Sequence, residues 1–320
     1  MRTVLVVNPK SANGATGRHF AQIARAVRAA IGDFEHEFTT APLEATALTR
    51  RALARGAQCV VAVGGDGTTN EVVNGFFDEQ GRPLAQAAAL GIVPRGTGGD
   101  FRKAFGWSAD LAQAAARLKG EACRIIDVGR IRFVDARGAP AARLFVNIAS
   151  AGVSGLVDFE VNRASKVLGG KVSFALGTLK AMLRYRDVPV RATFDGGPVE
   201  TFPATVVAVA NGQFFGGGMW IAPGARPDDG TFDVTIWSGY GLGDFVTRGK
   251  AIYDGSHVRF PNTRTLKARR VTLEADAPVL LDVDGEQLGQ LPATIELLPG
   301  ALRLKVGEAE PTAPSSQAAL

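Results

Sequence analysis

The first 124 residues alternate between short strand patterns and amphipathic helical patterns, and this alternation constrains the fold more than any other feature. From residue 18 to 31, for example, apolar side chains recur on one helical face and arginines fall opposite them. The order strand, helix, strand predicts an α/β domain whose parallel sheet is covered by helices on both faces. The strand patterns cover residues 3–7, 35–39, 59–63 and 90–93, and the helical patterns cover 18–31, 43–55 and the run NEVVNGFF from residue 70.

From about residue 125 the pattern changes to many short β-rich segments separated by turn residues, down to ATIELLPG and ALRLKVG. Such spacing is typical of an antiparallel sandwich or barrel-like domain. We expect one helical insert, at 163–186, and a disordered tail at 307–320. The sequence therefore predicts an α/β domain over 1–124 and a β-rich antiparallel sandwich over 125–306, whose last strand can return to the first domain.

The net charge limits the kinds of binding partner that we expect but does not identify one. A net charge of +5 and a pI near 9.4 permit attraction to phosphates, nucleic acid or acidic lipid. Lysines and arginines are spread along the chain, without zinc-finger spacing or an RNA-binding aromatic signature, so we expect no nucleic-acid partner. The apolar runs are too short for a signal peptide or a bilayer-spanning helix. We expect a cytoplasmic protein with no more than peripheral contact with a membrane.

A glycine-rich motif, GGDGTTN, follows the third predicted strand and precedes a helical run. Glycines let the backbone approach a phosphate closely, and a helix N-terminus offers unpaired N–H groups. A P-loop would end in GK[ST], and a dinucleotide fingerprint would place a third glycine at Asn70. A carboxylate here suits a Mg²⁺ ion bridged to phosphate, although a plain helix-capping turn is the alternative. The candidate residues are Gly64, Gly65, Asp66, Gly67, Thr68, Thr69 and Asn70.

Two further polar loops leave predicted strands in the same direction, NPKSANG from residue 8 and PRGTGGDF from residue 94. Parallel α/β sheets bind ligands at the carboxyl ends of their strands. Three such loops at one edge predict a nucleotide site, with Asn8 and Lys10 as additional candidates.

Together these loops, the segment ANGQFFGGGMWIAPGARPDDGTFD and the late LDVDGE resemble the diacylglycerol kinase catalytic-domain family, which includes bacterial lipid kinases and sphingosine kinases. The resemblance runs from Asn8 to about Val306, whereas the GGDGT turn alone also occurs in NAD kinases and phosphofructokinases. It implies an NAD kinase- or phosphofructokinase-like first domain. It also implies an ATP- and Mg²⁺-dependent kinase that acts on the hydroxyl of a diacylglycerol-like or sphingoid lipid.

The resemblance also implies roles for single residues. Thr97 and Thr39, with Thr40 nearly as good a match as Thr39, would join the glycine loop around the nucleotide phosphates. Asp284 and Glu286 would be the catalytic pair, one of which takes the proton from the lipid hydroxyl. A structural magnesium ion would be bound by Asp229 and by the main-chain oxygens of Arg226 and Thr231.

Several alternatives stay open. Asp-Gly at 284–285 is by itself a common hairpin turn. Gly99 stands where the family usually has Asn, although Asp100 is retained. A kinase of a soluble alcohol or of NAD, and a nucleotide- or lipid-binding protein without turnover, are the competing functions. An apolar stripe in the helical insert fits either a membrane surface or a packed core: Leu168, Val172, Ala175, Leu176, Leu179 and Leu183.

Overall fold

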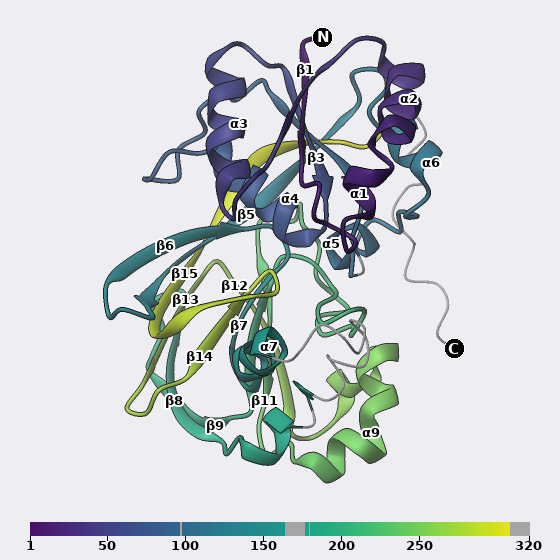
Figure 1. Cartoon of the computed structure of the whole chain (residues 1–320). Coiled ribbons are helices and arrows are strands. Elements are labelled where there is room, and N and C mark those ends of the chain that lie inside the picture. Colours follow the sequence, from purple (N-terminus) through teal and green to yellow (C-terminus); the bar gives the residue numbers. More distant parts are fainter. Residues whose placement is uncertain (97, 164–176, 179, 308–320) are drawn as a thin grey trace. The chain divides into compact units, whose positions relative to one another are not determined.

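The computed structural model describes residues 1–96, 98–163, 177–178 and 180–307, and these divide into two compact units. The N-terminal unit comprises Met1–Ile126 and the chain from Ala301 onward. The C-terminal unit comprises Asp127–Gly300. Figure 1 shows both units, with colours that follow the sequence from the N-terminus to the C-terminus. Thr97, most of the predicted apolar stripe and the tail from residue 308 lie outside the described residues.

The N-terminal unit is built on a parallel sheet. Its strands lie in the order β2 (Glu35–Phe38), β1 (Thr3–Val7), β3 (Cys59–Gly64), β4 (Ala89–Pro94), with the end of β15 (Glu286–Lys305) parallel to β4. Leu5 pairs with Val61, and Val61 pairs with Gly91. Because both faces are covered, β1 and β3 are buried along their whole length.

Helices lie on both sides of this sheet (Figure 1). On one side α2 (Phe20–Ile31) and α6 (Leu111–Ala116) pack on the strands through a core that includes Ile23, Val27 and Ala114. On the other side α3 (Glu44–Ala54) packs against α4 (Asp66–Gly75). The predicted α/β architecture is confirmed. One helical boundary differs, because α1 (Ala15–Arg18) precedes α2 and His19 separates the two.

The C-terminal unit is a sandwich of antiparallel layers that share β15. One layer runs β12-β11-β10-β7-β14-β15, and in the other β13 pairs with β15 on one side and with β8 on the other. Apolar residues from both layers, such as Val209, Val234 and Leu273, form the core between them. The strand bounds are β5 (Cys123–Asp135), β6 (Pro140–Phe145), β7 (Ile148–Gly152), β8 (Val188–Phe194), β9 (Glu200–Ala204), β10 (Val206–Ala210), β11 (Phe232–Trp237), β12 (Thr263–Ala268), β13 (Arg270–Ala275) and β14 (Leu280–Val283).

Helices also cover the outer face of β7 and β10, and here the sequence prediction was incomplete. The chain is already helical from Val153, in α7 (Val153–Arg163), and α9 (Leu242–Asp254) was not predicted. Residues 180–184 are helical as expected, and Leu183 in that segment is exposed. In the described part of the chain, none of the helices has the length and apolar character needed to cross a membrane.

Candidate functional site

The glycine-rich motif forms the N-terminus of α4. β3 ends at Gly64, Gly65 has extended backbone, and the helix begins at Asp66. The sequence prediction placed the start of this helix at Asn70, so Asp66 to Asn70 belong to its first turn and not to a loop. A Cβ on Gly64 would lie 2.4 Å from Thr68 Oγ1, so this position requires glycine. The first N–H groups of a helix have no partner within the helix, and at α4 they follow two glycines that carry no side chain.

Side-chain hydrogen bonds fix this helix end. Asn8 Nδ2 donates to Thr68 Oγ1 (3.1 Å), which ties the first polar loop to α4. Thr69 Oγ1 donates to the carbonyl oxygen of Gly65 (3.3 Å). The Asn70 side chain has a role inside the helix, since its Oδ1 accepts from Asn74 Nδ2 (3.1 Å). The structure thus brings Asn8 and Thr68 together, ties Thr69 to Gly65 and assigns Asn70 a contact within α4.

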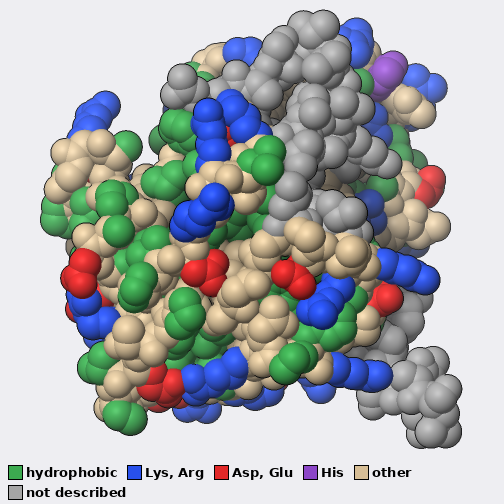
Figure 2. Space-filling model, turned by 90° about the horizontal axis from the view of Figure 1, so that it is seen from below, with side chains coloured by type: hydrophobic (Ala, Val, Ile, Leu, Met, Phe, Trp, Pro, Cys, Tyr) green, Lys and Arg blue, Asp and Glu red, His purple; other side chains and the backbone are tan. Residues whose placement is uncertain are grey.

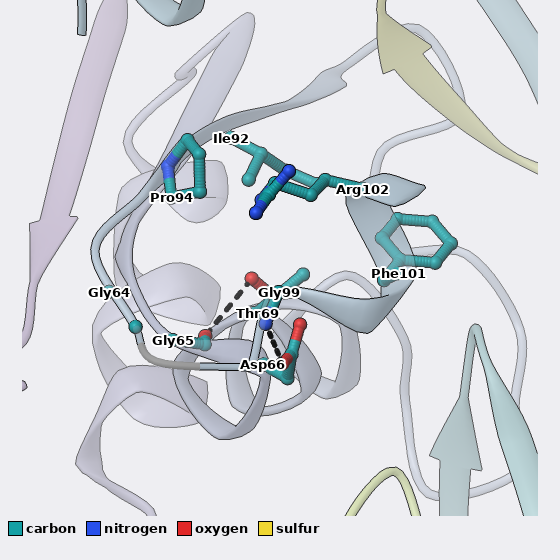
Figure 3. A pocket seen from close by; sticks show the side chains of 10 residues that line it. Gly64, Gly65, Asp66, Thr69, Ile92, Pro94, Gly99, Phe101 and Arg102 are labelled. Atoms are coloured by element: carbon teal, nitrogen blue, oxygen red, sulfur yellow. Dashed lines mark hydrogen bonds between the residues drawn. The ribbon is translucent and has the colours of Figure 1, made fainter. Parts of the chain in front are cut away.

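The second glycine-rich turn is held by Asp66 (Figure 3). Asp66 Oδ2 accepts from the N–H of Gly99 (2.7 Å) and of Asp100 (3.3 Å), at the start of α5 (Asp100–Lys103). Burial raises the pKa of the Asp66 carboxyl, the nearby Asp100 raises it further, and the backbone N–H groups partly offset both. These contacts fit a carboxylate whose role is to order the turn. They fit less well the role of magnesium ligand that the sequence suggested.

The departure at Gly99 leaves this turn intact. Gly99 has left-handed backbone, with φ +64°, a conformation that glycine adopts without strain and that Asn also tolerates. Asp66 binds the N–H of residue 99, which any residue there except proline supplies. Asp100 is buried and pairs with Lys103 Nζ at 2.6 Å.

Beside Thr68 lies a hollow of about 190 Å³. It brings together residues predicted from separate loops, and both candidate threonines after β2 line it. The Thr40 hydroxyl donates to Glu44 Oε2 (2.8 Å), whereas Lys10 Nζ donates to the Thr40 carbonyl oxygen (3.3 Å). The lining residues are Asn8, Lys10, Thr39, Thr40, Ala41, Pro42, Ala45, Thr68 and Glu71.

In the C-terminal unit, Asp284 lies in the turn between β14 and β15. Its Oδ1 accepts from the N–H of Asn147 (3.1 Å) and of Ile148 (3.0 Å), and its Oδ2 accepts from the N–H of Val146 (3.1 Å). Asp284 itself has φ +52°, a conformation that Asp tolerates better than most residues. The carboxylate therefore fixes the backbone at the start of β7.

Glu286 differs from its neighbour. Its side chain is 35% exposed, and Oε2 lies 3.7 Å from Nη2 of Arg143 on β6. Sequence reasoning missed Arg143 and also Asp282, a buried carboxylate that accepts from Gly285 N–H (2.8 Å) and Ser150 Oγ (3.3 Å). Asp282 stands two residues before Asp284 in LDVDGE, but an alternating strand pattern gives no sign that one inward position is acidic.

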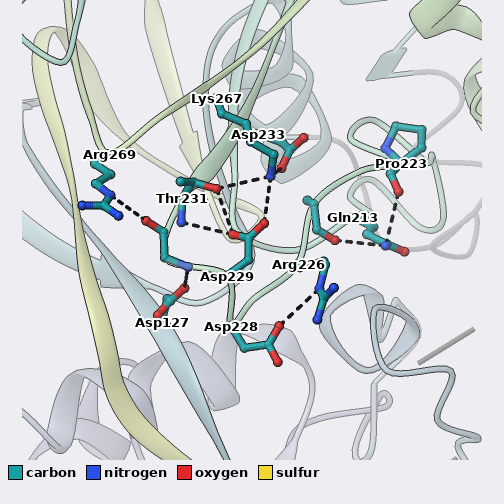
Figure 4. A network of polar contacts seen from close by, with 12 residues as sticks. Asp127, Gln213, Pro223, Arg226, Asp228, Asp229, Thr231, Asp233, Lys267 and Arg269 are labelled. Atoms are coloured by element: carbon teal, nitrogen blue, oxygen red, sulfur yellow. Dashed lines mark hydrogen bonds and ion pairs between the residues drawn. The ribbon is translucent and has the colours of Figure 1, made fainter. Parts of the chain in front are cut away.

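The turn at Asp229 has a basic partner that the sequence reading did not foresee (Figure 4). Lys267 Nζ donates to Asp229 Oδ2 (2.8 Å), and Thr231 Oγ1 donates to Asp229 Oδ1 (2.9 Å). Burial alone would raise the pKa of Asp229, but its hydrogen bonds to Lys267 and Thr231 lower it. Burial likewise acts to lower the pKa of Lys267, but hydrogen bonds to Asp229 and Asp233 raise it overall.

The magnesium ion implied by the resemblance does not fit this turn. An ammonium group already lies against the Asp229 carboxylate that would be its ligand. Among the residues that the structure describes, no group of three or more His, Cys, Asp or Glu side chains is placed to bind a metal ion.

Two family models match the chain. The diacylglycerol kinase catalytic domain covers residues 2–131, and the YegS C-terminal NAD kinase beta sandwich-like domain covers residues 147–306. A diacylglycerol kinase of Bacillus subtilis is 29% identical over 296 residues, which is 91% of each chain. A diacylglycerol kinase of Mycobacterium tuberculosis is 28% identical over 262 residues, 82% of this chain and 81% of the other.

Solved structures agree with these matches. A crystal structure of a diacylglycerol kinase from Bacillus anthracis superposes with a TM-score of 0.70 at 25% identity, over 97% of this chain and 98% of that one. Yeast NADH kinase shares the fold alone, with a TM-score of 0.52 at 12% identity over 97% of this chain and 84% of that one. The chain therefore belongs to the diacylglycerol kinase catalytic-domain family of lipid kinases, with a C-terminal beta sandwich-like domain of the YegS type.

Proposed function

We propose that this chain transfers the γ-phosphoryl group of ATP to the hydroxyl of a diacylglycerol-like or sphingoid lipid. The observation that carries the proposal is the N-terminus of α4, which lies beside the hollow lined by Asn8, Thr39 and Thr68. It belongs to a segment that the diacylglycerol kinase catalytic domain matches. We assign nucleotide binding to the N-terminal unit and lipid binding to the C-terminal unit.

The nucleotide phosphates would lie at the start of α4, because unpaired N–H groups and the helix dipole attract anions there. Lys10 lines the adjacent hollow and adds positive charge. Mg²⁺ would be bound mainly by the phosphates, as is usual for this ion in kinases, and would neutralise charge on the transferred group. Positioning and electrostatics of this kind are the main requirements of phosphoryl transfer.

We assign the two acidic residues of the DGE motif different tasks. Asp284 binds three backbone N–H groups and acts as a positioning residue. The Glu286 side chain is 35% exposed and would accept the proton of the lipid hydroxyl. Arg143 Nη2 lies beside this carboxylate, 3.7 Å from Glu286 Oε2.

Lipid transfer requires access to a membrane or micelle, and we propose peripheral contact. Figure 2 shows basic side chains distributed among apolar ones on one face, without a single large acidic patch. Two large apolar side chains in the C-terminal unit are strongly exposed, Leu183 at 56% and Tyr253 at 52%. Leu183 is followed directly by Arg184, and Lys250 lies three residues before Tyr253, which suits an anionic lipid surface.

Transfer from γ-labelled ATP to a panel of acceptors tests the function. The panel contains diacylglycerol, phosphatidylglycerol, ceramide and sphingosine in mixed micelles, together with NAD and glycerol in solution. We expect label on a lipid hydroxyl and none on NAD or glycerol. Label on NAD or glycerol alone would refute the lipid assignment, and no transfer at all would favour a binding protein without turnover.

The nucleotide placement is tested with two matched valine substitutions. Gly65 and Gly241 both precede a helix with extended backbone, at φ −88° and −102°, and neither position has backbone closer than 3.5 Å to an added Cβ. We expect Gly65→Val to weaken ATP binding at least about tenfold, because its methyl groups would cover the start of α4. Gly241→Val should bind ATP normally. Equal affinity of both variants, measured by calorimetry, would move the nucleotide elsewhere.

A further inference from the structure

Three oxygen atoms surround the ammonium group of Lys267 in the C-terminal unit (Figure 4). Nζ lies 2.8 Å from Asp229 Oδ2, 3.0 Å from Asp233 Oδ2 and 3.2 Å from Thr231 Oγ1. Lys267 on β12 pairs directly with Asp233 on β11, so the strand register sets this position. The two carboxylates are mostly covered, at 23% and 19% exposure.

The same oxygen atoms would suit a hard divalent cation. Two carboxylates and a hydroxyl are typical ligands of Ca²⁺ and Mg²⁺. An ammonium group has three N–H donors and can satisfy three such acceptors at once. We propose that Lys267 is a built-in cation that replaces a divalent metal ion at the Asp229 turn, so that this turn is ordered without metal.

Gly230 and the second carboxylate oxygen of Asp229 also have partners within the protein. Gly230 N–H donates to Asp127 Oδ2 (2.8 Å), and the Gly230 carbonyl oxygen accepts from Arg269 Nε (3.0 Å). Asp229 Oδ1 accepts from both the N–H (3.1 Å) and the hydroxyl (2.9 Å) of Thr231. A divalent ion bound at Asp229 would lie close to the ammonium group and be repelled by it. Lys267 and a metal ion therefore exclude each other.

The test is the thermal unfolding of nucleotide-free protein in EDTA and in excess MgCl₂ or CaCl₂. We expect the unfolding midpoint of the wild type to be the same in all three conditions. Lys267→Met should lower the midpoint in EDTA by about 2 °C or more, and either divalent ion should restore it. The matched control is Lys250→Met, which removes an exposed lysine of α9 and should show neither effect.

Two outcomes would overturn the proposal. The first is an unfolding midpoint of the wild type that rises in Mg²⁺ or Ca²⁺ while the midpoint of Asp229→Asn stays unchanged. A metal ion would then occupy the turn. This comparison does not require that Lys267→Met folds. The other is a folded Lys267→Met that gains no stability from either ion. If Mg²⁺ or Ca²⁺ restores the midpoint of Lys267→Met but not that of the double variant Lys267→Met/Asp229→Asn, the ion binds at this turn and the proposal is supported.

Discussion

The Asp-Gly turns at Asp229 and Asp284 in the C-terminal unit have similar sequence and different chemistry. Gly230 and Gly285 both have left-handed backbone, at φ +74° and +87°. The carboxylate of Asp284 accepts from the N–H groups of three consecutive residues, 146–148. The carboxylate of Asp229 accepts from Thr231 and from the side chain of Lys267. One turn orders backbone and the other binds a cation.

The difference shows that an Asp-Gly dipeptide predicts a turn but not the role of its carboxylate. That role depends on which groups the fold brings close to the carboxylate. A hydrogen bond to a charged group contributes about 1.5–3 kcal/mol to stability, whereas an ion pair with an exposed partner contributes about 0–1 kcal/mol. Lys267 is 51% exposed, so we expect the Asp284 turn to be the more sensitive of the two.

The largest effect should come from Glu286, which directly follows the Asp284 turn. Glu286→Gln removes the proposed proton acceptor, and general-base assistance is worth roughly 10²–10⁴-fold in rate. We therefore expect turnover to fall by about that factor while ATP affinity stays unchanged. Steady-state kinetics and calorimetry measure the two.

The matched control for this variant is Glu274→Gln, since Glu274 also lies 3.7 Å from an arginine, Arg191. It should keep full turnover. Near-normal turnover in Glu286→Gln would remove the residue from the chemistry, and an equal loss of ATP binding would place it at the nucleotide.

Asp284→Asn should destabilise the protein by about 1.5–3 kcal/mol, because a neutral amide replaces an acceptor of charge-assisted hydrogen bonds. Asn tolerates the left-handed backbone of this position, so the fold should survive. Turnover should also fall, since Glu286 is two residues away. Urea unfolding of this variant beside Asp229→Asn measures the contrast, and equal losses in the two would contradict it.

A matched pair of glycine substitutions separates strain from function. Gly230→Ala and Gly285→Ala each force an L-residue into left-handed backbone, at a cost of about 1–2 kcal/mol. Neither added Cβ would meet an atom closer than 4.0 Å, so strain should dominate in both. We expect similar losses of stability but reduced turnover in Gly285→Ala alone. A similar loss of turnover in Gly230→Ala would mean that both turns serve the reaction.

The sequence predicted the features that depend on local patterns. β1 and β3 read clearly as continuous apolar runs because they are buried on both faces. The glycine-rich motif before α4 was equally clear in the sequence, and at Gly64 the close approach of Thr68 explains why glycine is needed. By contrast α9 was missed, because Gly243 and Gly249 lower helix propensity within it.

Features that depend on distant partners could not be predicted. Pro299 and Gly300 read as a turn, yet β15 continues through them, and Gly300 N–H donates to Asp127, 173 residues away in sequence. Likewise Lys267 is 38 residues from Asp229, and nothing in TLKARR marks it as the partner of a distant turn. The resemblance implied a magnesium ligand at Asp229, and the structure adds a contact that no local pattern predicts, from Lys267 Nζ to the Asp229 carboxylate.

The smallest effect should be that of Asp229→Asn, which costs up to about 1 kcal/mol at pH 7 because Lys267 is half-exposed. The pH dependence of this loss of stability tests whether the charge of Asp229 causes it. The pKa of Asp229 lies below its ordinary value of 3.8, so its stabilising effect is present above that pH and is lost on acidification. The difference between wild type and Asp229→Asn, measured by urea unfolding, should therefore shrink as the pH falls below about 4. A constant difference from pH 7 to pH 3 would show that the charge of Asp229 does not stabilise the turn.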